Sequence, residues 1–575
     1  MAAPGTGALQ IHTRTTMKIT VDQAVTEPYD LCVIGSGPAG IIVTLEYQKL
    51  QPAHRILLIE YGPDKATARN ALDDSIKIVD TKNHHLPPEC TNKGLGGSSG
   101  TWGGRCVMYD EIDFQPRAIL KGECTWDSSL LQEVRKFADQ TGEYFECGRA
   151  QFNLEDLPAY ARSRIADGFQ NGEVTDTTLE RWSMPTRFGE RFAPEILSAK
   201  NTHLLTGWEV FSLGPPANDG AVTNLYIRDF DRQKQAQITA RKIVIAAGAQ
   251  ETTRLLLKNP RVFQARGGQP PALGKYYQGH VSGKIATVQF YGDPQKTDYG
   301  FLRTGDGVFL RRRLQLTTEA LQKHNLLNTA LWLDNPLYVD PAHRNGAMSF
   351  MYLAMITPIL RNRLAPPAIR HSITKGKVTG IGKHLGNILR DFPKSLSIPA
   401  STFYGRYCLK RKLPGVFLYS PRNLYALHFH AEQVPVPENR MELAADQETL
   451  NIHYHYTSQD VDSVIRTHEL LDNWLRQCKC GELVYWFPKG ELPAAIHAMS
   501  IDGLHQVGTT RISRTPEQGV VDENLKVWGT SNLFVCSSSA FPTSGQANPT
   551  FLLGTFAVRL AHHLSSANIS TVIEH

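Results

Sequence analysis

The sequence predicts an α/β fold in which a discontinuous domain with a parallel, doubly wound sheet is joined to an α+β domain built on an antiparallel sheet. An apolar run, a glycine-rich turn, a helical stretch and a second apolar run follow one another within residues 30–60. This is the βαβ unit of a parallel sheet. Apolar strands of the same character recur at 243–249 and 533–536. Residues 285–293 and 425–434 instead alternate like strands of an antiparallel sheet.

The length of the chain indicates more than one domain. Its 575 residues, 41% hydrophobic and 20% charged, have ordinary globular composition but exceed what one hydrophobic core organises. Similar strands occur near the start, in the middle and near the end, so we expect one domain to be assembled from residues 25–150, 200–265 and 500–575. The second domain is expected to take 151–199 and 266–499, with a basic insertion at about 340–415.

The segments expected in the parallel-sheet domain are two early strands with a helix between them, a glycine-rich loop and a later strand. Residues 30–35 and 55–60 are expected to be buried strands on either side of a helix that runs to Leu50. Residues 94–106 form a loop rich in Gly and Ser. The strand at 243–249 leads into a helical stretch, ETTRLLLKN.

The C-terminal half contains two further helices with clear signals. Residues 458–476 carry apolar side chains at helical spacing. Thr457 and Asp460, at the start of this segment, are a candidate capping box. The strand at 533–536 is followed by the helical sequence TFLLGTFAVRLAHHL.

The turn after the first strand reads Gly-Ser-Gly-Pro-Ala-Gly, from Gly35 through Ser36 and Gly37 to Gly40. Gly35 permits the tight turn, Gly37 lets the backbone approach a pyrophosphate, and Gly40 allows the helix to pack closely on the strand. Glu60 ends the next strand, where an acid can bind the ribose hydroxyls of an adenosine. The spacing predicts a Rossmann-type dinucleotide site but does not distinguish FAD from NAD.

Several longer segments resemble the glucose–methanol–choline (GMC) oxidoreductases, a family of FAD enzymes. GLGGSSGTWGGRCVMYDEIDF looks like their flavin-binding signature. HQVGTTRISRTPEQGVVDENLKVWGTSNLFVCSSSAFPTSGQANPTFLLGTFAVRLAHHL resembles their C-terminal region, and HAEQVPVPENRMEL and IVIAAGAQETTRLLL also fit. The resemblance runs in the family's order over residues 30–565 and implies a noncovalently or covalently bound FAD.

The resemblance also implies which residues contact the cofactor. In the flavin loop these are Gly96 and the residues Gly97, Ser98, Ser99 and Trp102. Val210 and Ala247 match positions beside the ADP moiety. Ser538, Asn548, Pro549 and Thr550 match positions near the flavin ring, and the final helix would point its N-terminus toward that ring and stabilise the reduced, anionic flavin.

His505 matches the family's active-site histidine, and Asn548 matches the second catalytic position, which is His or Asn in different members. Oxidising an alcohol requires removal of the hydroxyl proton while a hydride leaves to flavin N5. A neutral imidazole is a suitable base, and an amide NH₂ can hold the same hydroxyl oxygen. We therefore expect FAD-dependent oxidation of an alcohol with His505 as base. A lyase branch of the family keeps flavin and histidine without redox chemistry and stays open as an alternative.

Two departures from the family pattern refine this expectation. Some sugar oxidases attach FAD through a His in the flavin loop, where Thr101 stands here, so noncovalent FAD is expected. The ANPT sequence ending in Thr550 is closer to the sugar-oxidising branch, which favours a sugar or glycoside hydroxyl. The second signature is only partly matched by ETTRLLLKNP. The sequence does not indicate whether oxygen, a quinone or a protein accepts the electrons.

Positive charge is concentrated in residues 361–412. This segment has twelve Lys and Arg against one acid, Asp391, whereas the whole chain has a formal net charge of only +6. That overall charge is too mild to imply nucleic acid binding. The local excess indicates either a solvated insertion or a surface that meets anionic lipid or an anionic substrate, and a membrane-surface flavoprotein is a second alternative.

The remaining signals are weak. His428 and His430, like His453 and His455, are H-x-H pairs on probable strands that could present two imidazoles to a metal, but no partner has convincing spacing and no metal is expected. Nine Cys, with Cys478 and Cys480 as a lone C-x-C, indicate reduced thiols. The polar N-terminus lacks a secretory apolar core, and no apolar run is long enough to span a bilayer, so the expected location is the cytoplasm.

Overall fold

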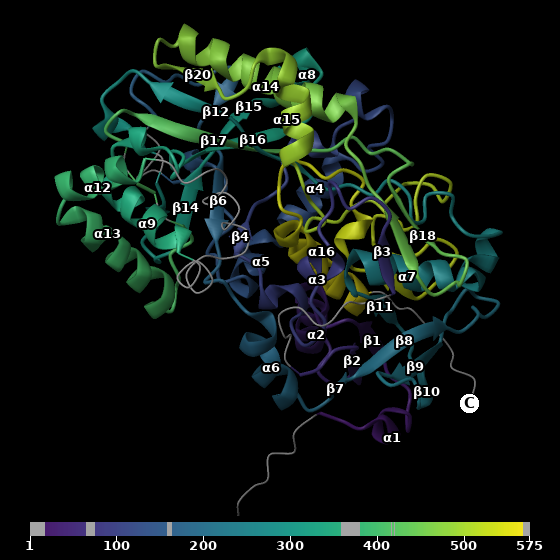
Figure 1. Cartoon of the computed structure of the whole chain (residues 1–575). Coiled ribbons are helices and arrows are strands. Elements are labelled where there is room, and N and C mark those ends of the chain that lie inside the picture. The colour runs from purple at the N-terminus through teal and green to yellow at the C-terminus, as the bar shows by residue number, and fades with distance from the viewer. Residues whose placement is uncertain are drawn as a thin grey trace, which may run out of the picture.

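The computed structural model describes residues 18–64, 75–157, 164–298, 300–357, 380–415, 417–418 and 420–566. It confirms the α/β class with parallel and antiparallel sheets in different parts of the molecule (Figure 1). The parallel sheet lies at one end of the molecule and a large antiparallel sheet at the other. The last helix, α16 (Thr550–Ser566), lies between these two ends in Figure 1.

The parallel sheet has the strand order β21-β11-β1-β2-β7. Its strands are β1 (Leu31–Ile34), β2 (Ile56–Glu60), β7 (Thr202–Thr206), β11 (Ile243–Ile245) and β21 (Leu533–Val535). All neighbours pair in parallel. The three central strands β1, β2 and β11 are buried along their whole length, as expected for a sheet covered on both faces.

Helices connect and cover this sheet. α2 (Pro38–Leu50) follows β1 and begins at the N-cap Gly37, with Pro38 in the first turn, where its missing N–H is harmless. α16 packs against α2. α7 (Gly248–Lys258) follows β11, so the predicted strand at 243–249 is too long. Gly248 has φ +73° and starts the helix, because small residues at a strand end permit the turn.

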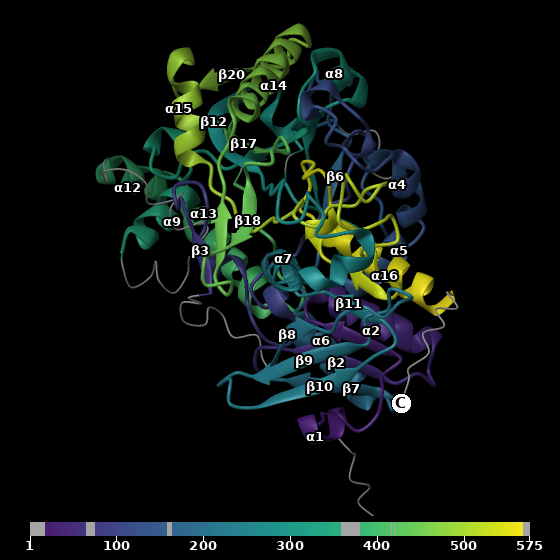
Figure 2. The same cartoon turned by 90° about the vertical axis from the view of Figure 1, so that its right-hand side faces the viewer.

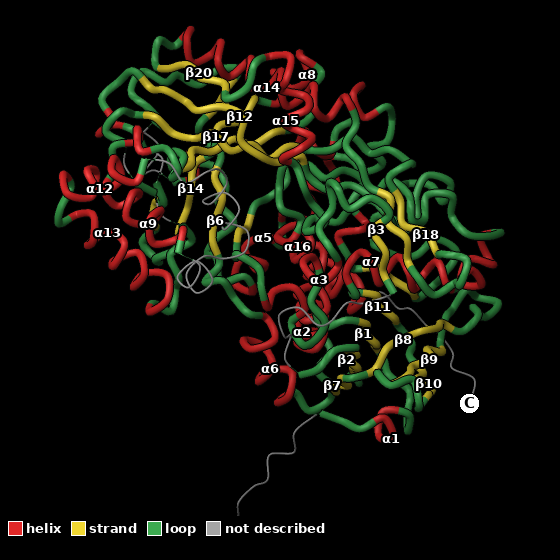
Figure 3. Tube along the Cα trace, viewed as in Figure 1, coloured by secondary structure: helices red, strands yellow, loops and turns green. Residues whose placement is uncertain are grey.

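The largest sheet is six-stranded and antiparallel, in the order β20-β12-β17-β16-β15-β5 (Figure 3). Its long strands are β12 (Val281–Phe290), β16 (Thr329–Asp334) and β17 (Leu424–Ala431), with β5 (Val174–Thr175), β15 (Leu314–Leu316) and β20 (Gly481–Tyr485) at the sides. α14 (Ser458–Gln477) packs on it with α15 (Leu492–Met499). The capping box is confirmed: Thr457 N–H donates to the Asp460 carboxylate at 2.6 Å.

Three smaller sheets complete the fold. One contains β13 (Leu302–Arg303), β14 (Phe309–Arg312), β6 (Leu179–Trp182) and β4 (Arg105–Cys106). A second contains β8 (Trp208–Leu213), β9 (Asn224–Asp229) and β10 (Gln235–Thr239), beside the parallel sheet in Figure 2. The third contains β3 (Ile76–Ile78), β18 (Arg440–Leu443) and β19 (Leu450–His453).

The described part of the basic insertion is helical. It consists of α9 (Gly346–Ile356), α12 (Ile381–Arg390) and α13 (Lys394–Phe403), which form a group at the left edge of Figure 1. Five of the twelve Lys and Arg in residues 361–412 lie outside the described residues: Arg361, Arg363, Arg370, Lys375 and Lys377. Among the helices the structure describes, none is both long and apolar enough to span a bilayer.

Candidate active site

One cavity of about 1010 Å³ extends from the parallel sheet to the C-terminal segment. All but two of the cofactor-binding residues predicted from the sequence line it, together with both predicted catalytic residues. These are Gly35, Ser36, Gly37, Glu60, Gly97, Ser98, Ser99, Trp102, Val210, Ala247, His505, Ser538, Asn548, Pro549 and Thr550. The exceptions, Gly40 and Gly96, do not line the cavity.

The glycines of the first turn each meet a distinct steric requirement. Gly35 has φ +99°, a left-handed conformation that other residues rarely adopt. A Cβ at Gly40 would lie 2.0 Å from the Gly35 carbonyl oxygen, so only glycine lets the helix pack this closely. A Cβ at Gly37 would enter open space. The backbone at Gly37 is therefore accessible at the N-terminus of α2, where the helix dipole favours an anion.

Glu60 organises this end of the cavity. One carboxylate oxygen accepts from the Ser36 backbone N–H at 3.1 Å and from its hydroxyl at 2.6 Å. The other accepts from the N–H groups of Gly62 at 2.8 Å and Gly94 at 3.0 Å. The carboxylate thus ties three loop segments together at the end of β2, in addition to lining the cavity where a ribose was predicted to bind.

The flavin-loop segment is a short 3-10 helix, η1 (Gly97–Gly100). Ser99 Oγ donates to the Gly96 carbonyl at 2.6 Å and accepts from the Phe188 N–H at 3.1 Å. Arg187 donates to the carbonyls of Ser99 at 2.7 Å and Trp102 at 2.9 Å. These bonds fix the loop from outside, leaving Gly97 in contact distance of Gly37 across the first turn.

His505 and Asn548 are joined at the other end of the cavity. Asn548 Nδ2 lies 2.6 Å from His505 Nε2. Because the amide NH₂ can only donate, this contact leaves Nε2 as the unprotonated ring nitrogen and puts the ring proton on Nδ1. His505 Nδ1 lies 3.5 Å from the Asp502 carboxylate. Asn548 stands two residues before α16, and Ser538 Oγ donates to the Gln506 carbonyl at 2.7 Å, which braces the segment carrying His505.

Asp502 is the buried anion behind the histidine. Burial raises the pKa of its carboxyl, but the neighbouring His505 and His280 outweigh this and hold the pKa well below its usual range. The carboxylate also accepts from the His280 backbone N–H at 2.6 Å. Asp502 is therefore ionised and places a buried negative charge beside His505.

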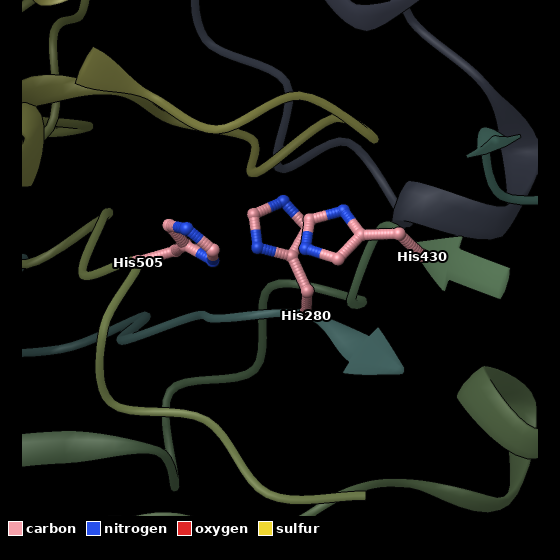
Figure 4. A group of neighbouring side chains, drawn as sticks. All are labelled: His280, His430 and His505. Atoms are coloured by element: carbon pink, nitrogen blue, oxygen red, sulfur yellow. The ribbon is translucent and has the colours of Figure 1, made fainter. Parts of the chain in front are cut away.

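Two more histidines lie directly behind His505 (Figure 4). His280, at the start of β12, and His430, on β17, are stacked with ring centroids 4.0 Å apart. His280 meets His505 edge-on at 4.9 Å. Burial lowers the pKa of both His280 and His430, that of His430 well below its usual value, so both rings are neutral near pH 7.

The three rings have ligand nitrogens within 4.8 Å of one another, which is the geometry of a candidate metal cluster. However, the lone pair of a ring nitrogen lies in the plane of its own ring. Because the His280 and His430 rings are stacked, their lone pairs do not converge on one ion. His430 Nδ1 is 2.7 Å from the Gln546 carbonyl, and His505 Nε2 already contacts Asn548. The arrangement fits a packed wall of neutral imidazoles better than a chelate.

A layer of buried charge supports this wall. Glu180 on β6 is fully buried and forms ion pairs with Arg105 on β4 and Arg311 on β14. Both guanidinium groups lie over the ring of Trp332, at 4.3 Å and 4.7 Å. His428 stacks on Trp332 at 4.3 Å. Arg105 also lines the cavity, so this layer contributes a positive charge to the cavity wall.

Several of these residues were not identified from the sequence. Asp502 stands three residues before His505, a spacing that could have marked it as the partner of the histidine. His280, Arg105, Glu180 and Arg311 have no local signal, because strand pairing alone brings them together. Of the two H-x-H pairs, only one enters the site: His453 pairs with Glu442 at 2.9 Å near the surface. Cys478 and Cys480 are free thiols away from the cavity.

Comparison with known proteins agrees with this geometry. Residues 435–557 match the model of the GMC oxidoreductase family. A stretch of 63 residues is 38% identical to a 2-methyl-1,2-propanediol dehydrogenase of Mycolicibacterium austroafricanum, and it spans 11% of this chain and 11% of that relative.

Two solved structures share the fold over almost the whole chain. A fungal aryl-alcohol oxidase, 16% identical, covers 94% of this chain and 99% of its own with a TM-score of 0.50. Pyridoxine 4-oxidase from Mesorbium loti, 15% identical, covers 93% and 99% with a TM-score of 0.51. The chain therefore matches the GMC oxidoreductase model over residues 435–557 and shares the fold of these two oxidases over almost its whole length.

Proposed function

We propose that this protein oxidises an alcohol group, on a sugar or glycoside, with noncovalently bound FAD as hydride acceptor. The observation that carries the proposal is the contact between His505 Nε2 and Asn548 Nδ2 in the same cavity that begins at the Gly35–Gly40 turn. A base and an amide donor converge at one end, and a pyrophosphate cradle lies at the other. The match of residues 435–557 to the GMC oxidoreductase model supports the same chemistry.

The residues present fit FAD. Gly37 leaves open space at the N-terminus of α2 for a pyrophosphate, and Glu60, Val210 and Ala247 lie around the adenosine end. Pro549 and Thr550 lie at the start of α16, whose dipole favours negative charge near its N-terminus. When bound, the flavin would supply the two-electron acceptor. The loop offers Thr101 where a covalent link would need an imidazole, which supports noncovalent binding.

The side chains explain where the proton of the substrate hydroxyl goes. When substrate binds, its hydroxyl takes the place of the Asn548 amide at His505 Nε2, and Nε2 accepts the hydroxyl proton as a general base. Asp502 stabilises the resulting imidazolium through Nδ1 and needs no proton itself, because its pKa stays low. Asn548 donates from its amide to the same hydroxyl oxygen and holds it in line. Because His280 and His430 are neutral, they add no positive charge beside this base.

A hydroxylated, polar substrate is supported by the groups around the catalytic pair. Arg105, Trp182 and Lys412 line the cavity near this end and offer hydrogen-bond donors and an aromatic face. These are the surfaces that sugars contact, and the Asn548 position follows the sugar-oxidising branch. Two proteins that share this fold are named an aryl-alcohol oxidase and a pyridoxine 4-oxidase, and the test therefore includes aromatic alcohols.

The test is anaerobic reduction of the bound flavin by a panel of sugars, glycosides, aromatic alcohols and simple diols, followed by absorbance. We expect sugars or glycosides to bleach the flavin fastest. Reduction by aromatic alcohols alone would overturn the substrate class but not the activity. A bound flavin that no alcohol reduces would contradict the redox function and favour lyase chemistry.

A further inference from the structure

One helix of the basic insertion, α12, is packed with its polar side inward. α12 and α13 lie against α9 at the edge of the molecule (Figure 1). On α12 the buried side chains are His384 and Asn387. His384 Nδ1 lies 3.0 Å from Ser349 Oγ, and Asn387 Nδ2 donates to the Pro341 carbonyl at 2.9 Å. Hydrogen bonds therefore hold α12 to the protein.

The apolar side of α12 faces solvent, and several apolar residues of α13 are exposed beside it. Leu389 is 77% exposed and Phe392 is 64% exposed. Ile381, Leu385 and Leu389 are four residues apart and form one stripe on α12. A helix on an ordinary protein surface has the opposite arrangement, with its apolar stripe toward the core. We call this surface the α12–α13 face; its exposed apolar residues are Ile381, Leu385, Leu389, Phe392, Leu396 and Phe403.

Positive charge surrounds the α12–α13 face. Residues 380–415 contain seven Lys and Arg against one acid, Asp391. Lys383 and Lys394 are exposed on α12 and α13 themselves. A partner must therefore offer both an apolar layer and negative charge. A second copy of this chain docked face to face would place the same positive charges against each other, so the complementarity favours an anionic lipid surface.

We propose that the α12–α13 face docks the protein onto the surface of anionic membranes. The apolar stripe enters the interface between headgroups and acyl chains, and the lysines and arginines contact lipid phosphates. The chain that follows α13 also lines the catalytic cavity, through Arg406, Tyr407 and Leu413. Docking therefore places the wall of the cavity beside the bilayer.

The test is co-sedimentation of the full-length, FAD-loaded protein with vesicles of phosphatidylcholine alone or mixed in equal parts with phosphatidylglycerol. We expect binding to the anionic vesicles, weakened by salt. The double variant Leu385→Glu, Leu389→Glu should lower the partition coefficient by more than about tenfold, since each leucine loses its burial. Lys383→Glu with Lys394→Glu should lower it by about fivefold or more for each lysine.

The matched control is Val484→Glu, which places an acid at another exposed apolar site, on β20, and should bind as the parent does. The lysine variants, which leave the apolar stripe intact, serve if the leucine variant does not fold. The proposal is overturned if the parent ignores anionic vesicles. It is also overturned if both sets of variants bind as well as Val484→Glu, or if the parent dimerises through this face and binds no vesicles. None of these outcomes depends on flavin reduction.

Discussion

At the scale of single residues, the site depends on which ring nitrogen of His505 carries the proton. The amide of Asn548 occupies one ring nitrogen as a donor, and the ionised Asp502 lies 3.5 Å from the other. Those two neighbours select one tautomer before any substrate arrives. A base that is already in the correct tautomer needs no rearrangement during the reaction, which is the contribution of a preorganised site.

Replacing His505 by Ala removes the base but none of the bonds that shape the nucleotide end of the cavity. We expect the variant to retain flavin and to lose roughly 10²–10⁴-fold in the rate of flavin reduction, the usual range of general-base catalysis. Stopped-flow reduction under anaerobic conditions measures this directly. Reduction at the parent rate would show that His505 is not the base.

Asp502→Asn tests a positioning residue that does not touch the substrate. The variant keeps a similar shape but loses the negative charge that favours the imidazolium, so flavin reduction should slow by roughly 10²-fold or more, in the direction seen for the orienting acid of a catalytic triad. Asp502→Glu, which keeps the negative charge, should recover part of the lost rate. A rate in Asp502→Glu as low as in Asp502→Asn would indicate a merely structural role.

At the scale of elements, buried polar groups join the sheets behind the site. Strands β4, β6 and β14 meet through the Arg105–Glu180–Arg311 ion pairs, and Trp332 on β16 connects that sheet to the six-stranded one. Removing one of these three residues leaves a buried charge without its partner, whereas in the complete group the opposite charges stabilise one another. The position of the imidazole wall thus depends on four separate strands.

His468 on α14 gives a pH-dependent contribution to stability. Its ring is fully buried, edge-on to Phe429 at 5.4 Å, and burial lowers its pKa to about 4. Below its ordinary pKa of about 6.5, the unfolded chain binds a proton that the folded one does not, so acid favours unfolding. The loss begins as pH falls through about 6.5 and is complete near pH 4, where it reaches roughly 3 kcal/mol.

His468→Gln should therefore flatten the pH dependence of the free energy of unfolding between about pH 6.5 and 4, by up to about 1.4 kcal/mol per pH unit. Chemical denaturation at a series of pH values measures the slope. His453→Gln is the matched control, because that ring lies near the surface beside Glu442. Equal slopes in both variants would refute the assignment.

At the scale of the whole molecule, the sequence predicts those parts whose residues are consecutive. The Gly35–Gly40 turn, the flavin loop and the segment from His505 to Thr550 each carry their signal within a short stretch. His280 and Arg105 have none, because their place beside His505 results from pairing between strands far apart in the chain. The strand predicted at 243–249 is longer than the observed one because small apolar residues suit both a strand and the first turn of a helix.

The order of strands in the parallel sheet has a consequence for how the protein is made. β1 and β2 leave the ribosome early, yet β1 pairs on one side with β11, and β11 in turn pairs with β21 near the other end of the sequence. Until residues 533–535 have been synthesised, the nascent sheet has an unpaired edge of apolar strands, which is where chains aggregate. His505 and Asn548, the proposed catalytic residues, are also synthesised late. We expect the cofactor to be captured only after translation is nearly complete, and chaperones to have their main effect before that point.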